Sequence, residues 1–298
     1  MKTIKVGTRG SRLARAQTNW VIDALKALDA SLTFETIIIS TKGDEIQNIS
    51  LDKIGDKGLF VKEIEQQLLN GHIDIAVHSM KDMPSDQGSP LAFSKVPKRE
   101  DPRDVLSLRE GYTSLDDLPL GARIGTGSKR RLFQLLKVRP DIVPVAIRGN
   151  VETRLSKIEK ENLHGVILAA AGLHRLDLSH RITQYLDPKL MIPAPAQGAL
   201  ALQYHQERED LKALLNQLSD EDSDLCVRAE RAFLKGVNGS CHIPMGAYAV
   251  LSKDKETLEM TCVWGTEDGS ILKNVKLSGS SDAPELLGQR CADAIKEA

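Results

Sequence analysis

The chain has 298 residues, and its 40 Lys and Arg against 41 Asp and Glu give a formal net charge of −1 at pH 7. The length suggests about two domains, and the charge balance argues against a nucleic-acid binder, which usually carries a basic excess. No apolar run approaches the ~18 residues of a membrane span, and the N-terminal sequence lacks the apolar core of a secretory signal. We therefore expect a cytoplasmic protein without nucleic-acid or membrane partners.

The first hundred residues alternate between strand and helix patterns. Strands are expected at residues 2–7, 32–40 and 73–77, and helices at residues 11–28 and 59–70. The stretch 41–58 is rich in glycine and charge and shows little periodicity, so we expect it to be a mobile loop that serves as a lid.

A second α/β segment follows a crossing at residues 97–102. Strands are expected at residues 104–108, 122–125, 142–147 and 166–170, and helices at residues 128–138 and 151–161. This alternation is typical of parallel sheets with helices on both faces. A second, proline-rich crossing at residues 191–198 returns the chain to the first segment, which predicts a hinged clamshell with its ligand in the cleft.

The end of the chain changes character. Helices at residues 210–218 and 222–235 precede strands suited to an antiparallel sheet, at residues 247–251, 257–264 and 271–277, and a helix near residues 282–297. We predict domain 1 at residues 1–97 and 198–217, domain 2 at 102–193, and an α+β domain 3 at 219–298.

The motif VHSMKDMP, residues 77–84, begins where an apolar strand ends, and open α/β sheets bind ligands at such ends. Ser79, Lys81 and Asp82 lie close together in it. Asp82 is the strongest candidate for chemistry, because an acid there would stabilise a cation or move a proton. An ordinary polar exit from a strand has a similar composition, so both interpretations stand.

The motif IGTGSKRR, residues 124–131, joins a strand to a helix through small residues, which let backbone N–H groups approach an anion. Lys129, Arg130 and Arg131 then fall in the first helical turn, where the helix dipole disfavours cations. Unless the basic turn is merely tolerated, an anion is expected nearby.

Eleven arginines lie between residues 99 and 181, and Arg148 and Arg154 belong to IRGNVETRL, residues 147–155. Arg9 likewise follows the first strand. Arginine binds carboxylate and phosphate through a fork of two donors, so the ligand is expected to be polyanionic. The glycine-rich fingerprints of nucleotide-binding loops do not occur, which disfavours a nucleotide.

All four cysteines, Cys226, Cys241, Cys262 and Cys291, lie in the last quarter of the chain or so. No two of them have the spacing that zinc sites favour, so no metal is expected. Cys241 follows small residues and precedes a proline by three positions, which favours an accessible loop. It is the best candidate for covalent attachment, and the other three are expected to be inert thiols, as free cysteines usually are.

Taken in order, these segments resemble the porphobilinogen deaminase family nearly from end to end. The resemblance is carried by TRGSRLARAQ, KGLFVKE, HSMKD, KREDPRD, GTGSKRR, RGNVETRLSK, PAPAQGAL and NGSCHIP. It implies a transferase of porphyrin and haem biosynthesis that condenses four porphobilinogen molecules head to tail into hydroxymethylbilane, with loss of ammonia. It also implies a dipyrromethane cofactor in thioether linkage to Cys241. The implied fold has two domains like periplasmic binding proteins and a third α+β domain, and we expect a monomer.

The resemblance also implies site residues. Asp82 would be the catalytic acid, and Lys53 and Lys57 would lie on the lid. Cofactor binding is implied for Cys241, Lys81, Ser79, Thr126, Ser128, Arg130, Arg131 and Arg154. Substrate binding is implied for Arg9, Gln17, Arg148 and Arg175. Each pyrrole of this chemistry carries an acetate and a propionate, which is the polyanion that the arginines indicate.

Three positions depart from the family pattern: Gly127, where a serine is usual, Ala196, where a glycine is usual, and Ser240, where a glycine is common. All exchange one small residue for another, and the change at Gly127 puts one side-chain hydrogen bond in doubt. The alternative function is a non-catalytic anion-binding clamshell, since fold alone does not separate binders from enzymes. Such a binder has no need of a thiol linked to a cofactor.

Overall fold

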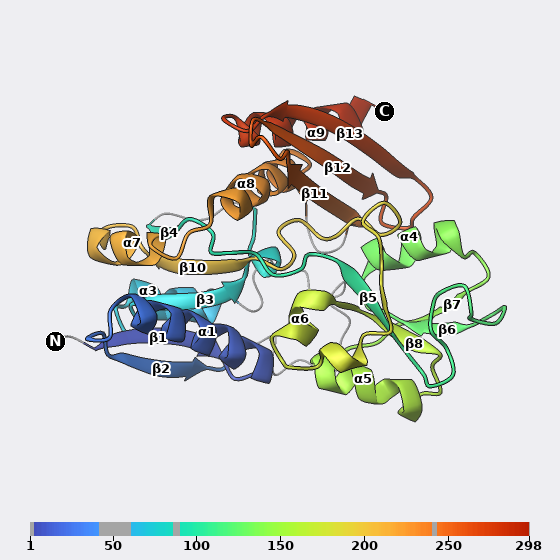
Figure 1. Cartoon of the computed structure of the whole chain (residues 1–298), viewed down its shortest axis with the longest axis horizontal. Coiled ribbons are helices and arrows are strands. Elements are labelled where there is room, and N and C mark those ends of the chain that lie inside the picture. Colours follow the sequence, from blue (N-terminus) through green and yellow to red (C-terminus); the bar gives the residue numbers. More distant parts are fainter. Residues whose placement is uncertain (1–2, 42–60, 86–89, 240–242, 298) are drawn as a thin grey trace. The chain divides into compact units, whose positions relative to one another are not determined.

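A computed structural model describes residues 3–41, 61–85, 90–239 and 243–297 of the chain. It divides into two compact units, Met1–Glu100 with Ala199–Val227 and Asp101–Gly198 with Arg228–Ala298. Figure 1 shows the elements of both. Within the described ranges, every helix is too short or too polar to cross a membrane.

The first unit is built on a five-stranded sheet in the order β2-β1-β3-β10-β4. Its strands are β1 (Ile4–Arg9), β2 (Phe34–Ile39), β3 (Ile75–Ser79), β4 (Leu91–Phe93) and β10 (Leu200–His205). The first three are parallel, as expected, whereas β10 runs antiparallel to β3 and β4. The expectation of a purely parallel sheet was wrong, because β10 enters directly from the second crossing, with Leu200 opposite Ser79, and no helix carries the chain back first.

Helices cover both faces of this sheet. They are α1 (Arg12–Leu28), α3 (Lys62–Leu69) and α7 (Glu209–Asn216). Leu25 of α1 and Leu215 of α7 share a buried cluster with Val77, whereas Ile64 of α3 packs with Ala76. Because successive side chains of β3 point to opposite faces, a continuous apolar strand supplies both clusters.

The second unit repeats this architecture with a sheet in the order β7-β6-β8-β5-β9. Its strands are β5 (Asp104–Leu108), β6 (Arg123–Gly125), β7 (Val143–Val145), β8 (Gly165–Ala169) and β9 (Gln184–Tyr185). Its helices are α4 (Lys129–Val138), α5 (Val151–Lys160) and α6 (Ala170–His174). Strand β6 is parallel to β7 and β8, but β5 is antiparallel to β8 and β9, so this sheet is also mixed.

A three-stranded antiparallel sheet, β11 (Met245–Leu251), β12 (Thr257–Gly265) and β13 (Leu272–Ser280), follows α8 (Glu221–Gly236). The closing helix α9 (Pro284–Glu297) packs against β12 and β13 (Figure 1). These elements confirm the α/β class with a small antiparallel sheet near the C-terminus. The boundary between the two compact units falls inside α8, and the three-domain boundaries stay a prediction.

Candidate functional site

The carboxyl edge of the first sheet gathers several of the predicted residues. Arg9 ends β1 and Ser79 ends the neighbouring parallel strand β3, and the short 3₁₀ turn Met80–Asp82 follows at once. Gln17, buried on α1, donates a hydrogen bond from Nε2 to Oγ of Ser79 at 2.9 Å. The structure therefore brings Gln17 and Ser79 into contact, and it leaves Asp82 exposed at the end of the turn.

His78, next to Ser79, is buried and faces a polar network. Its Nε2 lies 3.1 Å from Oε1 of Gln203, whose Nε2 donates to Oε1 of Glu65 at 2.8 Å. Burial, together with the positive charge of Arg9, lowers the pKa of His78 to about 4, although the hydrogen bond to Gln203 acts in the opposite direction. His78 is therefore neutral at pH 7, and its ring is held in this buried network.

In the second unit, the small-residue turn after β6 is held by its own hydroxyl groups. The N–H of Ser128 donates to Oγ1 of Thr126 at 3.2 Å, and Oγ of Ser128 accepts from the N–H of Arg131 at 3.4 Å as the N-cap of α4. A Cβ atom at Gly127 would lie 2.7 Å from the carbonyl oxygen of Ile147. The departure at Gly127 is thus matched by a close backbone approach that leaves no room for a serine.

Arg130 and Arg131 fold back onto one buried acid, Asp104 at the start of β5. Nη1 of Arg130 donates to Oδ2 of Asp104 at 2.6 Å, and Nε of Arg131 donates to Oδ1 at 3.0 Å. The carbonyl groups of Ile192 and Ile167 accept further bonds from Arg130 and Arg131, at 2.7 and 3.0 Å. Burial raises the pKa of Asp104, but the two guanidinium charges outweigh it and hold the pKa well below its usual range.

This cluster keeps an excess of positive charge. Two guanidinium groups against one carboxylate leave +1, with Asp104 fully buried and both arginine side chains 6–7% exposed. Among the described residues, Arg130 makes hydrogen bonds through Nη1 alone, so Nε and Nη2 keep three N–H donors for a ligand. The cluster is therefore suited to bind a carboxylate.

Three further predicted arginines belong to the second unit: Arg148 lies in a loop, Arg154 lies within α5 and Arg175 is the C-cap of α6. Arg148 has a buried Nη1 atom for which the described part of the chain provides no acceptor. Nε of Arg154 donates to the carbonyl oxygen of Gly149 at 2.8 Å, and Nη2 of Arg175 donates to that of Gly198 at 2.7 Å. Of these three, Arg148 shows the clearest sign of a missing anionic partner, because buried polar atoms are nearly always hydrogen-bonded.

Three predicted residues, Lys53, Lys57 and Cys241, lie outside the described residues, as does Ser240. In the sequence, Cys241 falls between α8, which ends at Gly236, and β11, which begins at Met245. Within the described ranges, no three His, Cys, Asp or Glu side chains are grouped to hold a metal ion.

Sequence reasoning missed the partners of the arginine pair. Asp104 is the first residue of an apolar strand, and Gln197 and Gln134 carry no charge that would single them out. One feature of the sequence could have indicated the role of Asp104. It is an acidic residue at the start of an apolar strand, and a buried acid requires a cationic partner. Gln197 belongs to the motif PAPAQGAL, whereas nothing in the sequence pattern marks Gln134.

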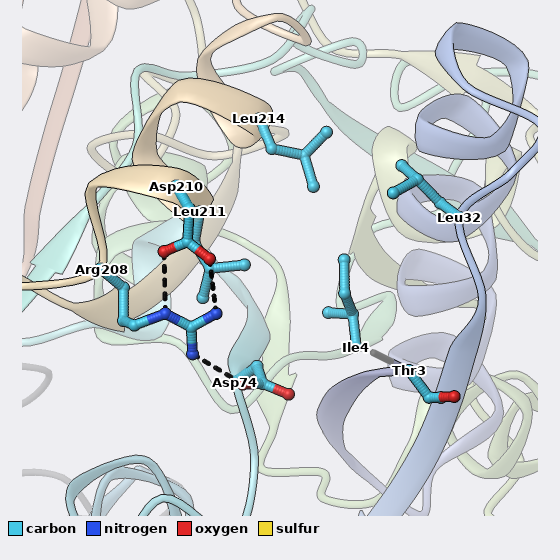
Figure 2. Close-up of a pocket in the computed structure, with 8 residues that line it drawn as sticks. All are labelled: Thr3, Ile4, Leu32, Asp74, Arg208, Asp210, Leu211 and Leu214. Carbon is cyan, nitrogen blue, oxygen red and sulfur yellow. Dashed lines mark hydrogen bonds and ion pairs between the residues drawn. The ribbon is translucent and has the colours of Figure 1, made fainter. Parts of the chain in front are cut away.

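A pocket of about 310 Å³ lies in the first unit, and Figure 2 shows the residues that line it. Thr3 and Ile4 line it at the start of β1, the opposite end of that strand from Arg9. Arg208 borders it, but its Nε and Nη2 donate to Asp210 and its Nη1 to Asp74, at 2.7–2.8 Å. The guanidinium is thus occupied on every nitrogen, and the pocket lies away from the candidate site.

Comparison with solved structures gives matches of low similarity. The periplasmic VFT2 domain of Bordetella pertussis BvgS has a TM-score of 0.45 and 18% identity, over 72% of this chain and 86% of that one. A probable amino-acid transporter extracellular-binding protein from Bacillus subtilis has a TM-score of 0.44 and 13% identity, over 73% of this chain and 90% of that one.

Family models match the chain over most of its length. Residues 4–213 match the porphobilinogen deaminase dipyrromethane cofactor-binding domain, and residues 224–297 match the porphobilinogen deaminase C-terminal domain.

Curated relatives agree with the family models. The porphobilinogen deaminase of Clostridioides difficile is 56% identical over 98% of this chain and 96% of its own length. Those of Clostridium novyi and Bacillus subtilis are 55% and 47% identical over 98% of this chain, and over 98% and 92% of their own lengths. These matches favour the enzyme over the non-catalytic binder. The chain belongs to the porphobilinogen deaminase family, whose members use a dipyrromethane cofactor to condense porphobilinogen into hydroxymethylbilane.

Proposed function

We propose that Asp82 is the catalytic acid of this condensation and that arginines of the second unit bind the carboxylates of the pyrrole rings. The observation that supports carboxylate binding is the buried cluster of Arg130, Arg131 and Asp104, with its excess charge of +1 and three donors left on Arg130. Buried cationic donors without acceptors are destabilising, and an anionic ligand removes that penalty. The buried Nη1 atom of Arg148 is a donor of this kind, because no residue of the described chain accepts from it.

The same donors fit the dipyrromethane cofactor. Each of its two rings carries an acetate and a propionate, and forked guanidinium groups bind such carboxylates well. We assign its attachment to Cys241 and its contacts to Lys81, Ser79, Thr126, Ser128, Arg130, Arg131 and Arg154. The substrate contacts are assigned to Arg9, Gln17, Arg148 and Arg175, and Lys53 and Lys57 are assigned to a lid. When bound, the cofactor supplies the pyrrole carbon from which the product grows.

We assign to Asp82 the steps that act on the substrate. Its turn is fixed by hydrogen bonds from the N–H of Met80 to the carbonyl of Ala199, at 3.0 Å, and from the N–H of Met83 to the carbonyl of Met80, at 3.1 Å. The carboxylate accepts the pyrrole N–H of porphobilinogen and stabilises the positive charge that develops as the carbon–nitrogen bond breaks and ammonia leaves. It also takes up the proton that a pyrrole carbon loses when the new carbon–carbon bond forms.

Intact-mass measurement tests the attachment residue. The purified chain is expected to exceed its sequence mass by two linked pyrrole units, and Cys241→Ser is expected to lose this excess. The matched variant Cys226→Ser, which changes a buried thiol on α8, should retain it. An unmodified wild-type chain that porphobilinogen cannot load would refute the assignment.

Ammonia release tests the acid. Asp82→Asn is expected to fold and to lose most turnover, whereas the same change at exposed Asp116 should leave turnover near the wild-type rate. Near-normal ammonia release by Asp82→Asn would refute the role of Asp82.

Arg148→Ala should slow elongation more than it lowers the melting temperature, and the reverse pattern would make that arginine structural.

We also propose a cytoplasmic monomer with three domains at residues 1–97 with 198–217, 102–193 and 219–298. The three separate sheets of the described residues support the division into three domains. Light scattering at micromolar concentration tests the oligomeric state, and a dimer mass would overturn it.

A further inference from the structure

The second crossing is attached to the arginine cluster by a side chain that the function proposed above does not use. Gln197 is fully buried. Its Nε2 donates to Oδ1 of Asp104 at 2.9 Å and to the carbonyl oxygen of Pro102 at 2.7 Å, so both of its N–H groups are engaged. Gln197 therefore connects the two crossings of the chain to the carboxylate that both arginines share.

Gln197 also restricts the orientation of that carboxylate. Oδ1 of Asp104 accepts from Arg131 and Gln197, while Oδ2 accepts from Arg130. With donors converging from three directions, the plane of the carboxylate cannot rotate without breaking a bond. The directions of both guanidinium groups are consequently fixed through Asp104.

The position of Gln197 is in turn set by its neighbours. The N–H of Ala196, which has a φ of 59°, donates to Oε2 of buried Glu230 at 2.6 Å. Gln134 brackets Ile192, accepting from its N–H at 2.8 Å and donating to its carbonyl at 3.1 Å. The crossing is therefore a rigid support for the cluster over residues 192–197.

We propose that Gln197 is a positioning residue that aims the free donors of Arg130 at a ligand carboxylate by holding Asp104, an inference that rests on the proposed function. Its neutral amide is as important as its hydrogen bond. A carboxylate at residue 197 would reduce the cluster's charge from +1 to 0 and place two buried acids side by side. A glutamine holds Asp104 and keeps the charge that an anionic ligand requires.

The test compares Gln197→Met, which removes the donors, with Gln197→Glu, which keeps the shape and adds a charge. Gln66→Glu, at an exposed position on α3, is the matched control. The rate at which the full-length chain gains cofactor mass from porphobilinogen should fall about tenfold in Gln197→Met, as expected when a hydrogen bond to a charged group is lost. It should fall further in Gln197→Glu and stay unchanged in the control.

A second readout separates this inference from the proposed function. In the ¹⁵N-arginine-labelled chain, the Nε–H signal of Arg131 reports its bond to Asp104 whether or not cofactor loads. Both Gln197 variants should shift this signal and speed its exchange with water, and Gln66→Glu should do neither. If wild type fails to load, the proposed function fails, but the Nε–H comparison still judges the role of Gln197.

The inference would be overturned if both Gln197 variants gained cofactor mass at the wild-type rate, or if the Nε–H signal of Arg131 were unchanged in both. If Gln197→Met does not fold, Gln197→Asn replaces it, because the shorter amide withdraws the donor from Asp104 without adding an apolar group. Equal loading losses in Gln197→Asn and Gln197→Glu would refute the role of neutrality.

Discussion

Replacing the carboxylate of Asp104 with an amide is expected to destabilise the second unit strongly. Asp104 is fully buried between two arginines that are themselves 6–7% exposed, at 2.6 and 2.8 Å. Asp104→Asn removes the only carboxylate that contacts these two guanidinium groups within the described residues. Removing one partner of a buried ion pair lowers the free energy of unfolding by about 3–5 kcal/mol, which is a large share of a typical total.

Glu285→Gln is the matched control, because it makes the same chemical change in an ion pair at the surface. Glu285 binds Nε and Nη2 of Arg228 at 2.6 and 3.0 Å, but the two side chains are 54% and 43% exposed. Exposed pairs contribute about 0–1 kcal/mol. The difference between the two variants therefore isolates the effect of burial.

Urea unfolding followed by fluorescence supplies the measurement. Trp20 lies in α1 of the first unit and Trp264 in β12 of the second, so a Trp20→Phe background reports on the second unit alone. Since the pKa of Asp104 is depressed in the folded state, its contribution is present above about pH 4 and is lost as the pH falls further. If Asp104→Asn loses no more free energy of unfolding than Glu285→Gln at pH 7, the buried cluster stabilises this unit no more than an exposed ion pair does, and the reasoning is refuted.

Three further outcomes are expected. Gly127→Ser forces a Cβ to within 2.7 Å of the Ile147 carbonyl and should lower the free energy of unfolding by about 1–3 kcal/mol in urea; unchanged stability would contradict the close approach. His78, with a pKa of about 4 against 6.5 for the ordinary group, should show no imidazole NMR titration above about pH 5.5. Because the unfolded state then binds the extra proton, stability should fall by up to roughly 3 kcal/mol as the pH drops from 6.5 to 4, and a titration midpoint near 6.5 would refute the burial of His78. Burial and contact with Cys291 raise the pKa of Cys262, whereas the hydrogen bond with Cys262 lowers the pKa of Cys291. Because both thiols are buried, a thiol reagent should modify neither cysteine until urea unfolds the chain; rapid labelling of the native protein would contradict this.

Local patterns predicted most of the fold. The apolar run ending at Val77 and the helical spacing between residues 11 and 28 placed a strand and a helix that the structure confirms. Strands β4, β9 and β10 were missed, because β4 and β9 span two or three residues and β10 follows a proline-rich crossing without its own turn signal. The direction of β10 depends on pairing with β3, from which it is separated by more than a hundred residues, and no local pattern encodes such pairing.

The sequence likewise predicts some residues of the candidate site and not others. Arg9 and Ser79 lie at strand ends, where α/β sheets place polar side chains, whereas Arg148 lies three residues beyond the end of β7. The contact of Gln17 with Ser79 was implied only by the family resemblance, since 62 positions separate the two residues. The attachment residue, Cys241, stays a prediction made from its small neighbours and from that same resemblance.

The basic turn at Lys129–Arg131 shows why composition overstates the charge available to a ligand. The helix dipole argument required an anion beside these three cations, and the protein itself supplies two. Asp104 is shared by Arg130 and Arg131, and Glu267 lies 2.8 Å from Nζ of Lys129, 138 positions away along the chain. Three cations against two carboxylates leave a single positive charge. A carboxylate-binding site of this kind therefore has to be described by its net charge and its unpaired donors, both of which depend on long-range contacts that the count of arginines does not reveal.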